Sequence, residues 1–257
     1  MAATLLFGLV FVAAMIAVAW ASYFTLRALA AHRLDRESQD LASAVVVRIA
    51  ALHALILALV FNQEMRDYQA LERYIVQEAT AVADIYEDIA RYAAPAAAEV
   101  QAALMRYARL VVTEEWPRLG RDGRLVDAAW IERDAVYEAI LDLEPATARE
   151  QALRAHMLAK VQRIGDLRLE RQGAALHDLH PMFWVAAVAG VVLVSVAFFG
   201  FLPTPLNLGL IATFGAFTGL VMLFVYAFSN PFTVPGEVAP AAFERLLEER
   251  ARAGMFE

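Results

Sequence analysis

The sequence predicts an all-α membrane protein with four transmembrane helices and a helical extramembrane domain between the second and the third. Three observations predict this fold: an excess of apolar residues, a set of long apolar stretches, and a central segment with helical periodicity. Of the 257 residues, 60% are hydrophobic, and the mean hydropathy is +0.50. Soluble domains are nearer to about half apolar. We therefore expect the excess to be buried in a lipid bilayer.

Three of the apolar stretches are long enough to span a membrane, which takes about 20 residues as a helix. They comprise residues 5–26, 182–202 and 206–228. Pro203 and Pro205 separate the last two stretches, which predicts a tight helical hairpin. The first stretch lacks a basic leader and is longer than the apolar part of a signal peptide, so we expect it to be retained as a span.

The second span is shorter and more polar than the others. Residues 49–61 are apolar except for His53, and they would cover only about 20 Å as a helix. A full span must include Arg48 on one side or residues 62–64 on the other. Polar groups at membrane depth usually face a bundle interior or a water-filled path. In the alternative reading, Arg48 extends to the interface and His53 is a packing residue; for the helix as a whole we favour a protein- or water-facing role.

The predicted division of the chain follows from these spans. Transmembrane helices 1 and 2 occupy residues 1–63, a helical domain residues 64–180, the hairpin residues 181–229, and a C-terminal segment residues 230–257. Four spans put both termini and the central domain on one side of the membrane. We favour the cytoplasmic side of a bacterial inner membrane, because arginines flank the spans there and the second loop on the opposite side has no charge. The first loop opposes this orientation with Arg27, Arg33 and Arg36.

The central domain is expected to be helical throughout. Residues 64–91 contain no Gly or Pro, so the second span can continue into them as one helix. A second helix is expected from Pro95 to about residue 117, and a third from Asp127, as its cap, to Leu143. A turn at residues 120–123 separates these two. The last helix is expected from Pro145 to about His177. Apolar residues recur at helical spacing, which predicts a bundle core.

The chain lacks the signatures of several functional classes. Its net charge of −7 argues against a nucleic-acid partner, because phosphate backbones attract basic surfaces. With no cysteine, it has no disulfide and no thiolate metal site. It has no phosphate-binding loop, no nucleophile elbow and no zinc-protease motif. We therefore predict no enzyme activity and no cofactor.

Three groups of polar residues are candidate sites. A metal site is one interpretation of the first group, but an interfacial polar collar is favoured. The two acidic groups could act as acid and base or bind calcium, but solvated helix faces are favoured, so no metal site is predicted. The groups are His177, Asp178 and His180; Asp84, Glu87 and Asp88; and Glu114 and Glu115.

Small residues recur every four positions in the last two spans. Gly215 and Gly219 form such a pair in the fourth span, and Ala186 and Gly190 form one in the third. Small residues at this spacing let helices approach closely. They predict tight packing between spans, within or between subunits.

Several stretches, in their order and spacing, resemble the bacterial bestrophin-like membrane family. The resemblance covers nearly all of the chain after the first span. Its most specific parts are Glu78-Ala79, Glu115-Trp116, and the element from Pro231-Phe232 to Gly236. The stretches are residues 57–63 (LALVFNQ), 74–92 (YIVQEATAVADIYEDIARY), 107–116 (YARLVVTEEW), 167–184 (LRLERQGAALHDLHPMFW) and 230–238 (NPFTVPGEV).

The resemblance implies a pentameric channel whose second helix lines the pore and whose helical cytoplasmic domain extends the conduit. In bestrophins an Asn-Pro-Phe-Gly stretch after the fourth span leads into an acidic run that binds calcium. The start of that stretch is matched here, but residues 238–240 (VAP) replace the acidic run, so calcium gating by it is not expected. The matched residues are Asn230, Pro231, Phe232, Gly236 and Glu237.

The leading hypothesis is therefore a homo-oligomeric ion channel, with inorganic ions and further copies of this chain as partners. Two stripes of the second helix compete as the pore face. A ring of Arg48 would attract anions and a ring of Glu64 would attract cations, and the sequence leaves the ion open. The candidate pore-lining residues are Arg48, Ala51, His53, Leu55, Leu57, Ala58, Phe61, Asn62 and Glu64.

The sequence is also compatible with two functions other than a channel. The alternative to a channel is a non-conducting membrane scaffold or signalling protein whose helical domain docks a partner. A membrane enzyme acting on lipids ranks lowest, because no catalytic motif supports it.

Overall fold

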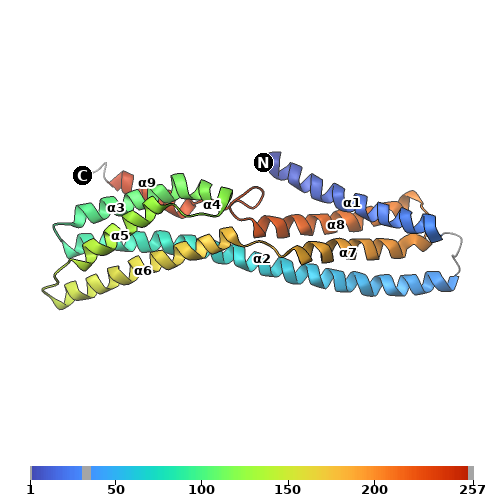
Figure 1. Cartoon of the computed structure of the whole chain (residues 1–257), viewed down its shortest axis with the longest axis horizontal. Coiled ribbons are helices and arrows are strands. Elements are labelled where there is room, and N and C mark those ends of the chain that lie inside the picture. The colour runs from blue at the N-terminus through green and yellow to red at the C-terminus, as the bar shows by residue number, and fades with distance from the viewer. Residues whose placement is uncertain (1, 31–35, 254–257) are drawn as a thin grey trace. The chain divides into compact units, whose positions relative to one another are not determined.

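The described part of the chain is all helical. The computed structural model describes residues 2–30 and 36–253, so the predicted loop residue Arg33 and the side chain of Arg36 lie outside the described part. Within these ranges there is no β-strand. The helices are α1 (Ala2–Ala30), α2 (Arg36–Tyr92), α3 (Ala97–Leu110), the π-helix η2 (Val111–Glu115), α4 (Trp116–Asp122), α5 (Asp127–Leu141), α6 (Ala148–Leu176), α7 (Pro181–Ala197), the 3₁₀ helix η3 (Phe198–Gly200), α8 (Pro205–Ser229) and α9 (Ala241–Ala253) (Figure 1).

The chain divides into two compact units, which we describe separately. The first, here called the apolar unit, comprises residues 1–66, 178–230 and 234–236. The second, the polar unit, comprises residues 67–177, 231–233 and 237–257. α2 contributes to both units as one uninterrupted helix of 57 residues, which confirms the predicted continuation of the second span. No Gly or Pro interrupts it.

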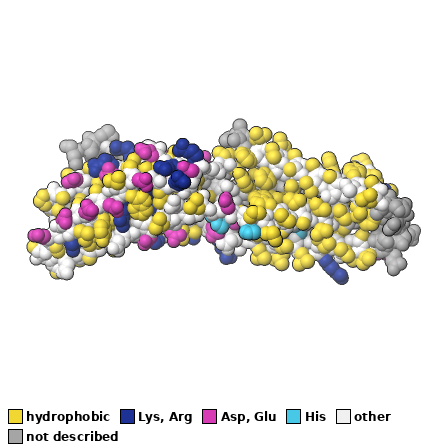
Figure 2. All heavy atoms as spheres, viewed as in Figure 1, with side chains coloured by type: hydrophobic (Ala, Val, Ile, Leu, Met, Phe, Trp, Pro, Cys, Tyr) yellow, Lys and Arg dark blue, Asp and Glu magenta, His cyan; other side chains and the backbone are white. Residues whose placement is uncertain are grey.

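The apolar unit contains α1, the first part of α2, α7 and α8. Together these provide four helices long and apolar enough to cross a membrane. Large hydrophobic side chains cover most of its visible surface (Figure 2). A soluble protein rarely exposes apolar patches beyond a few hundred Å². The chain is therefore an integral membrane protein, with lipid as the environment of this surface.

Glycines of α8 bring α1 and α8 into close contact. A Cβ atom at Gly215 would lie 2.9 Å from the carbonyl oxygen of Met15, and one at Gly219 would lie 2.7 Å from that of Phe11. Either is closer than real Cβ atoms approach. The predicted tight packing through Gly215 and Gly219 is thus confirmed within one subunit.

Polar side chains of α1 complete the hairpin between α7 and α8. Arg27 donates to the carbonyl oxygens of Phe199 and Phe201 at 3.1 and 2.8 Å, and the Tyr23 hydroxyl donates to Phe201 at 2.7 Å. Carbonyls at a helix end have no partner within the helix. At the other side of the turn, the Thr204 side chain caps α8 by accepting from Asn207 N.

The polar unit is a bundle around one hydrophobic core. α2, α3, α5, α6 and α9 contribute its buried residues, among them Ile85, Leu104, Val136, Met157 and Phe243. The core residues of α2 recur every three or four positions, as the sequence predicts for a helix that buries one face.

Several features of the polar unit differ from the predictions. The last helix, expected from Pro145, begins at Ala148 and is capped by Thr147. The helix expected to end near residue 117 continues through η2 and α4 to Asp122, and Gly123 ends it in the left-handed conformation at φ 66°. Asp127 is the first residue of α5 and not its cap, which is Val126. The C-terminal segment forms α9, for which no helix was predicted; its Phe243 and Leu246 pack into the core.

Candidate functional site

The candidate pore residues lie on two opposite faces of α2. Leu55 is 55% exposed, whereas His53 and Leu57 are only 5% and 4% exposed. At 100° per residue, positions 53 and 55 point about 160° apart on a helix. The apolar unit therefore buries one face of α2 and leaves the other uncovered by its own helices.

Part of the exposed face, here called the front stripe, is small or polar at most positions; the rest of that face carries large hydrophobic side chains, including Leu52, Ile56 and Leu59. Its members follow a spacing of three or four residues. Among the described residues, Arg48 has no hydrogen-bond or ion-pair partner. Arg48 is the one charged residue among residues 41–63 of the helix. The front stripe comprises Arg48, Ala51, Leu55 and Ala58, which are exposed, and Asn62, which is half-buried.

The buried face, here called the back stripe, packs against α7 and α8. The imidazole of His53 lies directly on Gly190 of α7, where an added Cβ atom would collide with the ring. Its ring centroid is 6.1 Å from that of Phe214 in α8. Leu57 belongs to the core of the unit. The small residue at position 190 thus admits the imidazole ring between two helices.

The other two predicted residues of α2 also face inward. Phe61 is half-buried, with its ring centroid 5.7 Å from that of Phe228 in α8. Glu64 is 3% exposed. A carboxylate in this position is enclosed by its own subunit, unlike the exposed Arg48.

The residues of the post-span motif are divided between the two units. In the apolar unit, the Asn230 side chain donates to the Tyr226 carbonyl at 2.8 Å, and a Cβ atom at Gly236 would collide with the Ala227 carbonyl. In the polar unit, Pro231 O accepts from Val238 N at 2.8 Å. Glu237 is exposed. Only a glycine therefore fits at position 236.

The same segment packs on an aromatic residue of the polar unit. Trp116 donates through Nε1 to the Val238 carbonyl at 2.8 Å, and its ring meets that of Phe232 at 5.4 Å in a T-shaped arrangement. A Cβ atom at Gly120 would collide with the Phe232 carbonyl oxygen. Trp116 and Phe232, two residues that carried the family resemblance, are thus packing partners.

A buried ion network lies inside the polar unit. Arg168 and Arg171 of α6 are both fully buried, as are Glu78 of α2 and Glu115 of η2. Arg171 donates to both carboxylates, and Arg168 donates to Glu115. The Tyr107 hydroxyl donates to Glu78. Two positive and two negative groups thus compensate each other away from water, which makes their burial tolerable.

Aromatic rings and a backbone amide complete the ion network. The guanidinium of Arg168 lies over the Trp130 ring at 4.2 Å from its centroid, and that of Arg171 lies over Trp116 at 5.4 Å. Val126 N donates to Glu115 Oε2 at 2.9 Å. Such cation–π contacts are worth more when desolvated, as here.

The two carboxylates of the network differ electrostatically. Burial raises the pKa of Glu78, and the opposing effects of Arg171 and Tyr107 do not offset it. Burial also acts to raise the pKa of Glu115, but Arg171, Arg168 and the Val126 amide outweigh it, so this pKa is lowered. Burial and the Glu78 charge raise the pKa of Tyr107 well above its ordinary value. Glu115 therefore keeps its negative charge more readily than Glu78 does.

Sequence reasoning found only half of this network. Glu78 and Glu115 carry the family resemblance, but their partners Arg168 and Arg171 were counted only among the arginines that flank the spans. A signal was present: both arginines continue the spacing of Val161 and Ile164, which are buried on the same face of α6. Glu115 and Glu114 do not form the predicted solvated pair, because Glu115 is buried while Glu114 is exposed.

The other polar groups form local contacts. Asp84 accepts from Lys160 at 2.6 Å. Asp88 is buried rather than solvated and lies 2.7 Å from both Arg91 Nη1 and His156 Nδ1. Within residues 2–30 and 36–253, no cluster of three or more His, Asp or Glu side chains could hold a metal ion. His177 ends α6 and His180 caps α7.

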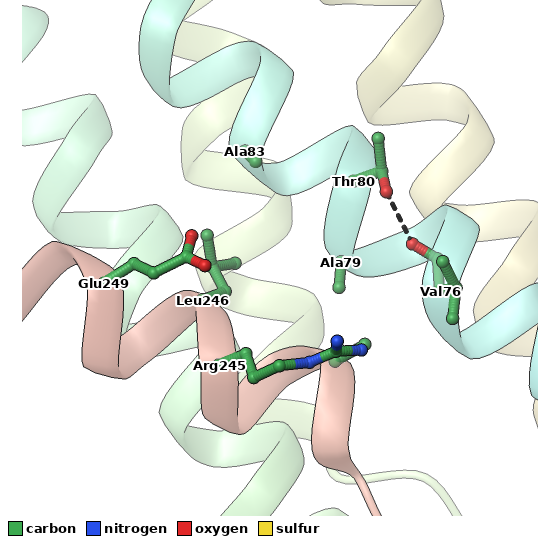
Figure 3. A pocket seen from close by; sticks show the side chains of 8 residues that line it. Val76, Ala79, Thr80, Ala83, Arg245, Leu246 and Glu249 are labelled. Carbon is green, nitrogen blue, oxygen red and sulfur yellow. Dashed lines mark hydrogen bonds between the residues drawn. The ribbon is translucent and has the colours of Figure 1, made fainter.

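A small pocket lies between α2 and α9. None of the candidate pore residues and none of the ion-network residues line it. Its volume is about 190 Å³ (Figure 3). The Thr80 hydroxyl donates to the Val76 carbonyl and so is already satisfied within α2. The lining residues are Val76, Ala79, Thr80, Ala83, Ala242, Arg245, Leu246 and Glu249.

Comparisons with known proteins identify one matching family. The family model of the bestrophin-like domain matches residues 13–243. Searches of curated proteins and of solved structures found no match.

Proposed function

Because the chain belongs to the bestrophin-like family, which is known for channels rather than for enzymes, we propose that it forms a homo-oligomeric, pentameric ion channel lined by the front stripe of α2. The observation that carries this proposal is the division of α2 into two faces. The residues of the back stripe are buried by packing within the subunit. The front stripe, with Arg48, is left for a partner or for water.

The burial pattern favours one of the two competing pore faces. A pore-lining side chain must be able to reach the axis of the oligomer, and the buried His53, Leu57 and Glu64 cannot do so without unpacking their own subunit. Arg48 is exposed. A ring of arginines attracts anions, so we propose that the pore favours anions at this position.

Energetics also support water beside the front stripe. An arginine at the centre of a lipid-facing helix costs about 2.5–3.5 kcal/mol on insertion scales. Arg48 lies at one end of the apolar stretch 49–61, so its cost in lipid is smaller than this, but its guanidinium would still have to extend to the interface. A water-filled path removes most of this cost, because the guanidinium stays hydrated. Arg48 is then better explained by a pore than by lipid contact.

The polar unit is proposed to lie in the cytoplasm of a bacterial cell, together with both termini. The inner membrane would hold the apolar unit. α2 continues from one unit into the other without a break, so a conduit that begins along its front stripe can extend beyond the bilayer.

Replacing Arg48 tests this proposal. In liposomes containing the purified protein, Arg48→Ala should lower chloride flux relative to potassium flux by about tenfold, the lower end of electrostatic steering effects. Arg48→Lys is the matched control, because it keeps the charge and should keep the preference for chloride.

Two outcomes would overturn the proposal. Unchanged selectivity in Arg48→Ala would show that the front stripe does not face the conducting path. An absence of flux for either ion, from protein shown to be folded and oligomeric, would instead favour a membrane scaffold whose polar unit docks a partner.

A further inference from the structure

His53 is a buried titratable side chain in an apolar helix bundle. It is 5% exposed, and its Nε2 atom is buried without a hydrogen-bond partner. Most buried polar atoms in proteins have a partner, and an exception calls for an explanation. The back stripe therefore carries a polar atom that makes no hydrogen bond within the described part of the packed structure.

No opposite charge lies close to His53 along the helices that pack against it. α7 carries no ionisable residue, and in α8 the one such residue is Tyr226. In the described part of α1 the ionisable residues are Tyr23 and Arg27. Along α2 the nearest charged residues are Arg48 and Glu64, five residues before and eleven after.

This environment suits a neutral imidazole and not a charged one. A neutral ring packs on Gly190 and Phe214 as an apolar group would. A charged ring without a counter-ion is costly to bury. Protonation therefore favours an arrangement in which the ring reaches water, and histidine is the side chain that changes charge in the physiological pH range.

The position of the ring links this change to α2. The imidazole sits between α2 and α7, in contact with the Gly190 backbone, so it can reach water only if α2 moves away from α7 or turns. The front stripe is on the opposite face of the same helix. Any such movement displaces Arg48, Ala51 and Leu55.

We propose that His53 is a positioning residue: when neutral it holds α2 against α7 and α8, and its protonation shifts α2 and changes conduction. This inference rests on the proposed function for its effect on ion flux. The helix movement itself does not, and it can be measured without flux.

The first readout is a distance within the apolar unit. The chain has no cysteine, so spin labels attach only where cysteines are introduced. Leu52 of α2 and Leu193 of α7 are both exposed and suit a labelled pair, diluted with unlabelled subunits. Acidification from about pH 8 to about pH 5.5 should shift the distance by about 1–2 Å, the scale of helix shifts in switching proteins.

Two controls separate the role of His53 from general effects of acid. In His53→Phe, which keeps an aromatic ring but cannot be charged, the same labelled pair should show no shift. Labels at Val10 of α1 and Phe217 of α8, both exposed, should keep their distance at either pH, because α1 and α8 pack through Gly215 and Gly219.

The second readout is ion flux across the same pH range. We expect a change on the order of tenfold in the wild type, since each pH unit can shift a proton-linked equilibrium tenfold, and no change in His53→Phe. Gly190→Ala should resemble the acid state at every pH, because its methyl group collides with the imidazole ring.

The outcomes distinguish this inference from the proposed function. A pH-dependent distance without flux at any pH would support the helix movement and contradict the channel. Flux with no pH-dependent distance, or an equal shift in His53→Phe, would overturn the inference and leave the channel standing.

Discussion

The two units bury ionisable groups in opposite ways. The polar unit encloses two arginines and two glutamates whose opposite charges compensate one another in a network reaching three elements, although Arg168 Nη1 and Arg171 Nε have no hydrogen-bond partner among the described residues. The apolar unit encloses His53 with an unpartnered nitrogen. A compensated network resists change because every displacement leaves a charge unpaired. A lone imidazole permits a shift of α2, because the gain of one proton turns a neutral buried group into an uncompensated charge. We infer that the polar unit is built for rigidity and that α2 is adjustable in the apolar unit.

The largest expected effect comes from breaking the ion network. Arg171→Met should destabilise the protein by about 3–5 kcal/mol, because Glu78 and Glu115 lose a buried partner. Thermal unfolding in detergent, followed by the loss of helical circular dichroism, measures this. The double variant Arg171→Met/Glu78→Gln should recover part of the loss. A midpoint unchanged in Arg171→Met would contradict the network's role.

An intermediate effect is expected from pH. The pKa of Glu115 is lowered in the folded protein, since the two arginines outweigh burial. Its stabilising contribution is therefore fully present above the unfolded value of about 4.5 and is lost as pH falls through the folded pKa. Unfolding midpoints measured across this range should decline in acid. The decline should be shallower in Glu115→Gln, which is less stable at neutral pH; parallel curves for the two proteins would argue against this assignment.

The smallest effect is expected from an ion pair near the surface. Arg106 and Glu132 form such a pair at 2.8 Å, with the arginine half exposed. Exposed pairs contribute about 0–1 kcal/mol, so Glu132→Ala should leave the unfolding midpoint nearly unchanged. A loss as large as that of Arg171→Met would remove the distinction between buried and exposed pairs on which the comparison depends.

The spans and the continuity of α2 could be predicted because they depend on local sequence. Length, apolar composition and the absence of Gly and Pro define them without knowledge of the partners. Close packing at Gly215 and Gly219 could be predicted from small-residue spacing alone, but their partner helix, α1, could not.

The contacts that make up the candidate sites were harder to predict. Glu115, the partner of Arg168, lies on the π-helix η2, and no local sequence motif predicts a π-helix there. The choice between the two stripes of α2 depends on which face meets α7 and α8, a tertiary fact. α9 was not predicted because its amphipathic pattern is short. The helix is stabilised by the packing of Phe243 into the core, which is a tertiary contact.

The most direct test of the central claim compares the two faces of α2 by chemical block. Leu55→Cys lies on the front stripe and Leu57→Cys on the back stripe, in a chain that has no other cysteine. A charged, water-soluble thiol reagent should block chloride flux through Leu55→Cys in liposomes at neutral pH and leave flux through Leu57→Cys intact. Block of Leu57→Cys alone, or of neither variant, would contradict a pore lined by the front stripe.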